Sequence, residues 1–193
     1  DEANADNVFL HKKRAEYLER AMYVCPYCGL ANFESHNDTI KCKTCNREIK
    51  YDITTELKGV GFDFPYRFVS EWYDYQKDYI NSLDVTANTE KPLFSDNARL
   101  SKVIVYKKKV LLDKNSSVSL FGDKIVIGND LVFPFNEVSA VTVLGKNKLN
   151  IYHDKNIYQL KGSKRFNALK YVNIYNRYMN IIRGDENGKF LGL

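Results

Sequence analysis

Residues 23–51 read YVCPYCGLANFESHNDTIKCKTCNREIKY, and this stretch contains all four cysteines of the chain. The cysteines form two C-x2-C pairs, Cys25/Cys28 and Cys42/Cys45, with thirteen residues between the pairs. A tetrahedral metal site needs soft ligands that two tight turns bring together, and this spacing is typical of one. The sequence therefore predicts a zinc ribbon whose four ligand positions are all filled by protein, so that the metal is structural.

The residues after each pair agree with this prediction. Gly29 and Asn46 directly follow the second cysteine of their pairs, where a knuckle turn reaches the left-handed region that Gly adopts freely and Asn tolerates. Alternation around Ile40 and over 48–53 predicts short strands. A module of this size buries too little apolar surface to fold unaided. We therefore expect metal binding, of the order of ~10–16 kcal/mol, to supply most of its stability.

Iron binding, disulfide formation and redox chemistry are the alternatives to zinc binding by these cysteines, and the sequence supports them unequally. Iron in a rubredoxin-like pair of knuckles takes the same ligands and spacing and remains an alternative to zinc. Disulfides need an oxidising compartment, which nothing in the sequence indicates. Thioredoxin-type chemistry uses one C-x-x-C pair in a βαβ unit, and that context is missing. His36 lies between the pairs as a further potential ligand, although four cysteines already complete the set.

The sequence contains no recognisable catalytic motif. It has no P-loop, no G-x-G-x-x-G and no G-x-S-x-G, and assignment of every thiol to the metal leaves no cysteine nucleophile. Asp74 and Asp78 stand one helical turn apart, and we interpret them as helix-surface charges beside Lys77 rather than as a carboxylate pair.

Outward from the cysteines, the chain divides into four predicted parts: an N-terminal segment with a helix (1–22), the ribbon (23–58), a helix with a linker (59–91) and a β domain (92–193). Apolar spacing predicts the first helix over 8–22 and the second after Pro65. The second helix carries Trp72, for which docking onto a neighbouring domain and packing within the ribbon or against the β unit are both open. The linker is expected over 84–92.

The C-terminal half predicts short antiparallel strands and one closing helix. Eight strand candidates are separated by Gly, Asn and Asp turns: 100–106, 110–112, 118–121, 125–127, 131–135, 138–144, 149–153 and 157–160. A helix is expected over 164–182 with Ser163 as its cap, and its predicted buried stripe consists of Leu169, Val172, Tyr175, Met179 and Ile182. This order is typical of a pleckstrin-homology (PH)-like barrel. The predicted fold class is therefore α+β: a small zinc ribbon with flanking helices, then an antiparallel PH-like β barrel closed by a C-terminal helix.

Charge is unevenly distributed along the chain. The net charge is +5, but residues 141–183 carry nine basic residues and one acidic residue, a net of +8. An anionic partner for this part, such as an anionic membrane surface, is one interpretation, and a solvated basic surface is the other.

No uncharged apolar run approaches the ~18–20 residues of a membrane span, and the acidic start does not resemble a signal peptide. We expect a cytoplasmic chain, or one at the cytoplasmic face of a membrane. Because it does not begin with Met, it is consistent with a piece of a longer protein.

Three short stretches of the sequence resemble parts of a known protein family. The stretch RAEYLERAMYVCPYCG (14–29) resembles a segment that follows the catalytic domain in some bacterial 1-acyl-glycerol-3-phosphate acyltransferases. SEWYDYQ (70–76) and PLFSD (92–96) look like later parts of the same extension, so the likeness covers about residues 14–100. The family's catalytic H-x4-D pair is absent here, because Glu16, Lys41 and Tyr158 stand five positions after the three histidines. Its Glu-Gly phosphate motif is absent too.

The resemblance implies a non-catalytic accessory region of a membrane-associated lysophospholipid acyltransferase. The expected partners are then an acyltransferase domain upstream and an anionic membrane surface. The alternative is a free-standing zinc-ribbon protein that binds nucleic acid or a protein partner. Nucleic acid is disfavoured, because the ribbon from Tyr23 to Tyr51 has four basic and three acidic residues, a net of only +1.

Overall fold

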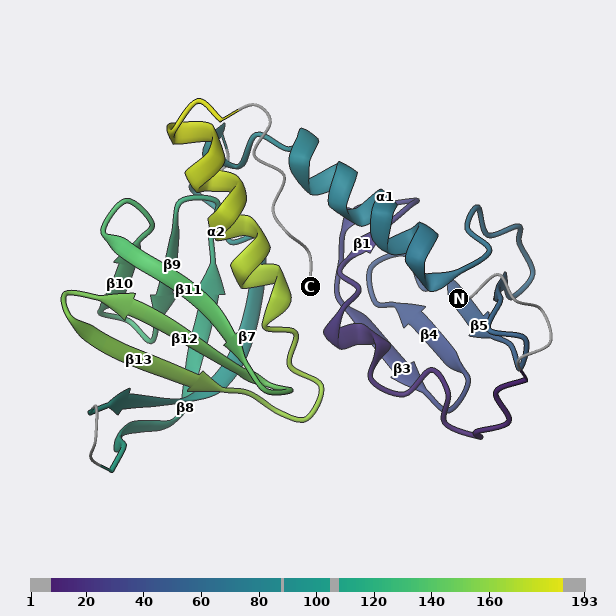
Figure 1. The fold of residues 1–193 in the computed structure, drawn as a ribbon, viewed down its shortest axis with the longest axis horizontal. Helices are drawn as coiled ribbons and strands as arrows, with labels where there is room; N and C mark the ends of the chain where they lie inside the picture. Colours follow the sequence, from purple (N-terminus) through teal and green to yellow (C-terminus); the bar gives the residue numbers. More distant parts are fainter. Residues whose placement is uncertain (1–7, 88, 105–107, 186–193) are drawn as a thin grey trace. The chain divides into compact units, whose positions relative to one another are not determined.

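A computed structural model describes residues 8–87, 89–104 and 108–185. The chain forms two compact units, Asp1–Tyr79 and Ile80–Leu193 (Figure 1). None of the helices in the described ranges is long and apolar enough to cross a bilayer.

The first unit is built from short antiparallel strands around the cysteines. β1 (Val24–Cys25) pairs with β2 (Gly29–Leu30). A four-stranded sheet has the order β3 (Phe33–His36), β4 (Thr39–Cys42), β5 (Glu48–Tyr51) and β6 (Leu57–Gly59). Burial alternates along β3 with the period of two that a half-buried strand requires. The ribbon strands therefore form as the sequence predicts, and Gly29 (φ 76°) and Asn46 (φ 60°) have the predicted left-handed conformation.

The predicted N-terminal helix is wrong. Residues 12–17 form turns, and only the 3-10 helix η1 (Leu18–Arg20) follows. Tyr17 has a φ of 75°, and its N–H donates to Ser35 Oγ at 2.7 Å. The N–H of Ala15 donates to the carbonyl of Asn37 at 2.9 Å. Bonds to the ribbon thus replace the local bonds of a helix, and tertiary contact overrides the apolar spacing.

Helix α1 (Val69–Ser82) begins four residues after Pro65 rather than directly after it. The Glu71 carboxylate accepts the N–H groups of Arg67 (2.7 Å) and Phe68 (3.2 Å), which satisfies free donors at the helix start. Trp72 is completely buried, and its ring packs edge-to-face on Phe33 of the ribbon at 5.3 Å. Of the two hypotheses for Trp72, packing within the ribbon is the one observed.

The second unit contains a seven-stranded antiparallel sheet that curves into a nearly closed barrel (Figure 1). The strands are β7 (Phe94–Val103), β8 (Val110–Leu120), β9 (Lys124–Ile127), β10 (Leu131–Pro134), β11 (Val138–Leu144), β12 (Lys148–His153) and β13 (Asn156–Lys161). Their order is β10-β9-β8-β7-β13-β12-β11, so pairing of β13 with β7 joins a four-stranded and a three-stranded meander. The predicted strands at 110–112 and 118–121 are one strand, β8, and β7 begins six residues before the predicted start. Within the predicted linker, η2 (Val85–Ala87) forms a 3-10 turn with Val85 buried.

Helix α2 (Leu169–Ile182) follows the sheet, as predicted, but it begins five residues late. Ser163 does not cap it: its Oγ accepts the N–H of Arg165 at 3.1 Å, within a turn. Instead, Asn167 Oδ1 accepts the N–H of Lys170 at 3.1 Å. The buried face was also predicted in the wrong phase, because of the predicted stripe only Tyr175 is buried and Ile182 is 48% exposed. The fully buried positions of this helix are Lys170, Tyr171, Asn173, Ile174 and Tyr175.

Candidate metal centre and the exposed β8 arm

The four predicted ligands come together in the first unit. The Sγ atoms of Cys25, Cys28, Cys42 and Cys45 all lie within 4.8 Å of one another. The Sγ atoms of Cys25 and Cys45 are 3.7 Å apart, and those of Cys28 and Cys42 are 3.6 Å apart. A tetrahedral site with Zn–S bonds of about 2.3 Å requires S···S distances of about 3.8 Å. The cluster therefore has the chemistry and the dimensions to bind a metal such as zinc.

The environment of the thiols differs from one cysteine to the next. Burial raises the pKa of Cys25 to about 11 and also raises that of Cys28. At Cys45 burial acts in the same direction, but hydrogen bonds from the backbone N–H and the side chain of Arg47 outweigh it and lower the pKa to about 6. Cys45 therefore loses its proton more readily than Cys25 or Cys28, and metal binding must displace the protons of those two thiols.

Arg47 was not identified as a site residue from the sequence. Besides contacting Cys45, its guanidinium lies over the ring of Tyr27, 4.2 Å from the centroid. The Tyr27 hydroxyl in turn donates to the carbonyl of Asp63 at 2.7 Å. These contacts tie the second knuckle to the first and to a later loop, in the way that outer-shell partners orient metal ligands. The only signal in the sequence was a basic residue two positions after the last ligand.

Helix α1 supports the first knuckle through Gln76, which is 1% exposed. Its Oε1 accepts the N–H groups of Tyr23 (2.7 Å) and Val24 (3.1 Å), and its Nε2 donates to the carbonyl of Ala21 at 2.9 Å. Trp72 Nε1 adds a bond to the carbonyl of Val24 at 2.9 Å. The backbone that enters Cys25 is thus held by side chains about fifty residues later in the chain.

Other candidate groups lie outside this cluster. His36 is exposed at the end of β3. Among the described residues, the candidate metal-binding cluster consists of the four cysteines and does not include His36. Asp74 is paired with Lys77 at 2.6 Å, so its interpretation as a helix-surface charge fits the structure.

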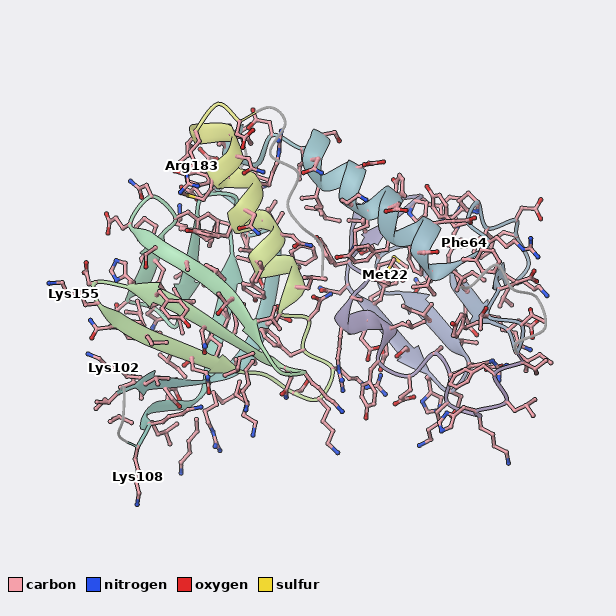
Figure 2. The ribbon with its side chains drawn as sticks, in the orientation of Figure 1. Met22, Phe64, Lys102, Lys108, Lys155 and Arg183 are labelled. Carbon is pink, nitrogen blue, oxygen red and sulfur yellow. The ribbon has the colours of Figure 1, made fainter. Side chains whose placement is uncertain are left out.

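A second feature is the arm formed by the first half of β8, residues 110–115. Val110, Leu111 and Leu112 are 45%, 45% and 48% exposed. Because successive strand residues point to opposite faces, exposure of all three means that neither face of the arm is covered. Alternating burial begins only at Ser116. Figure 2 shows Lys108 extending from the end of this arm and Lys102 on the adjoining strand β7.

Comparisons with known proteins identify no family. No protein-family model matches the sequence, and neither does any curated protein. Among solved structures, the chain is similar to the N-terminal PH domain of the human ARAP2 protein, with 16% sequence identity over 46% of this chain and 81% of that chain, and a TM-score of 0.35. The description of the second unit as PH-like rests on its own strand order and its C-terminal helix.

Proposed function

We propose that this chain is the non-catalytic accessory region of a membrane-associated lysophospholipid acyltransferase. Its ribbon holds a structural zinc ion, and its β unit contacts an anionic membrane surface. The observation that carries the membrane role is the uncovered β8 arm. The acyltransferase assignment rests on the resemblance of residues 14–29, 70–76 and 92–96. It requires that the same polypeptide carry a catalytic domain with an H-x4-D motif.

The zinc assignment follows from the donor set. Four thiolates suit zinc, and all four tetrahedral positions are supplied by protein, so a bound ion has no open position for water or substrate. Its contribution is the stability of the ribbon, in which Cys25 and Cys42 lie among buried residues such as Ile40 and Trp72. Native preparations analysed for metal should contain zinc, and a preparation that contains iron instead would replace this assignment.

The membrane role follows from the combination of apolar and basic groups on one projecting element. Leu111 and Leu112 are about half exposed, so transfer of each into the headgroup region contributes about 1 kcal/mol. Lys102 and Lys108 flank them, and a basic residue near an anionic surface contributes about 1 kcal/mol. Lys109 contributes less directly, because its Nζ donates to Gln159 Oε1.

Vesicle co-sedimentation tests this role. Replacing both leucines (Leu111→Gln with Leu112→Gln) should weaken binding to anionic vesicles by about 2 kcal/mol, or about 30-fold. Leu144→Gln is the matched control, because Leu144 is 45% exposed at the end of β11, outside the arm. The membrane role is wrong if the zinc-loaded wild type does not bind anionic vesicles, or if the control loses as much binding as the double variant.

A further inference from the structure

Four basic residues form a row across four neighbouring strands of the second unit. Lys148 of β12 is directly opposite Lys161 of β13, and Lys161 is directly opposite Arg99 of β7. Where Arg99 faces β8, the register shifts and Lys114 lies in the shifted segment. Directly paired residues of antiparallel strands share a face with their Cβ atoms about 4.5–5.5 Å apart, and like charges so placed are destabilising. The sheet itself would therefore be stabilised by a bound anion at this row.

A surface pocket of about 390 Å³ lies at one end of the row. Besides Ala98 and Gly162, its lining residues are basic or neutral and polar: Asn97, Arg99, Lys114, Asn115, Lys161 and Ser163. No lining residue is acidic. Within the described ranges, no carboxylate forms an ion pair with any of the three basic residues. The pocket thus collects three positive charges with which no carboxylate of residues 8–87, 89–104 or 108–185 forms an ion pair.

The acidic residue next to Lys114 in the chain is used elsewhere. The carboxylate of Asp113 accepts the N–H of Asn115 at 3.1 Å and the hydroxyl of Ser116 at 2.6 Å. These bonds hold the irregular segment of β8 in shape. Asp113 therefore positions the wall of the pocket instead of forming an ion pair with Lys114.

The opposite wall is also held in place. The N–H of Gly162 donates to the carbonyl of Asn147 at 3.1 Å, and Asn147 Nδ2 donates to the carbonyls of Gly162 and Ser163 at 2.9 Å each. A Cβ at Gly162 would lie 2.3 Å from the Cβ of Phe166, so the chain passes here in close contact with the residues behind it. Both walls are fixed by bonds that do not involve the basic side chains, which leaves those side chains available for a ligand.

We propose that this pocket binds a phosphomonoester dianion. Arg99 offers a planar fork of N–H donors that matches phosphate oxygens, and Lys114 and Lys161 add point charges. The amides of Asn97 and Asn115 and the hydroxyl of Ser163 are neutral donors for the remaining oxygens. The site includes Lys114 and Asn115 at the base of the β8 arm but neither of the leucines, so it goes beyond the proposed membrane contact and does not depend on it.

Thermal unfolding of the zinc-loaded full chain, titrated with inorganic phosphate against sodium chloride of equal ionic strength, tests the site. Phosphate should raise the unfolding midpoint of the wild type, and Arg99→Gln and Lys161→Gln should each weaken the apparent phosphate affinity by about tenfold or more. Without phosphate, both variants should unfold at a higher temperature than Lys155→Gln, because they remove repulsion within the row. Lys155 is the control: it is exposed in the β12–β13 turn and changes the net charge equally.

The inference is overturned if phosphate acts no more strongly than chloride, or if Arg99→Gln and Lys161→Gln keep the wild-type phosphate affinity. Phosphatidylcholine vesicles with and without phosphatidic acid distinguish the two sources of the ligand. Loss of binding to the phosphatidic acid vesicles in Arg99→Gln, with the leucines intact, supports a lipid headgroup. Wild-type vesicle binding in Arg99→Gln, together with lost phosphate affinity, supports a soluble phosphomonoester. The Leu111→Gln/Leu112→Gln variant should lose vesicle binding but keep the wild-type phosphate affinity. The membrane contact and the phosphate pocket can therefore be refuted independently of each other.

Discussion

Replacement of Gln76 by methionine should destabilise the ribbon without touching any metal ligand. The change keeps the length of the side chain but removes an acceptor for the N–H groups of Tyr23 and Val24 and a donor to the carbonyl of Ala21. Because Gln76 is 1% exposed, water cannot replace these bonds in place. A buried backbone group left without a partner costs about 1–3 kcal/mol. Three such groups, taken at the lower end because the backbone can shift, cost about 3 kcal/mol.

Denaturant unfolding followed by the fluorescence of Trp72 measures this cost. Trp72 is the single tryptophan of the chain and is buried in the ribbon unit, so its emission reports that unit. With zinc in excess, Gln76→Met should lower the unfolding free energy by about 3 kcal/mol and speed hydrogen exchange at the amides of Tyr23 and Val24. Asp78→Ala, an exposed change on the same helix, should stay within about 0.5 kcal/mol. A loss below about 1 kcal/mol with unchanged exchange at both amides would refute the role assigned to Gln76.

Three further predictions concern the metal, a buried ion pair and a close contact. Chelation of the metal, or Cys45→Ser, should unfold the ribbon and shift the emission of Trp72 to longer wavelength while the circular dichroism of the β unit persists; an unchanged emission would contradict a structural metal. Lys170, whose Nζ lies 2.8 Å from Asp96 Oδ2, has its pKa lowered by burial against the opposing effect of Asp96. The folded chain therefore loses this proton at a lower pH than the unfolded chain, whose lysine has a pKa near 10.5. In the alkaline window between the two pKa values, the unfolding free energy of the wild type minus that of Lys170→Met should rise with pH; a flat or falling difference as the pH approaches 10.5 would count against the lowered pKa. Gly162→Ala should lower the unfolding midpoint of the β unit, since the new Cβ meets Phe166 at 2.3 Å, whereas Gly145→Ala has open space and only the cost of its positive φ; equal effects would remove the close-contact argument.

Local chemistry made part of this structure predictable. The ligand spacing, the permissive residues Gly29 and Asn46 and the period-two strands depend on neighbours within a few residues, and each appears where the sequence placed it. The helix starts did not follow from the pattern, because hydrogen bonds decide them: Glu71 sets the start of α1, and Asn167 sets that of α2. The segment 8–22 failed for the same reason, since its backbone groups find partners on the ribbon.

The sequence by itself determined that four thiols would be available for one metal and that no cysteine would be left over. Only the tertiary structure decided what surrounds them, because Arg47, Trp72 and Gln76 are brought to the knuckles by stacking and by bonds to backbone groups. The same holds for the row of Arg99, Lys114, Lys148 and Lys161. Strand register places Arg99, Lys148 and Lys161 on one face, since a shift by one residue would turn a strand's basic side chain to the other side of the sheet. Lys114 joins this row through the irregular segment of β8.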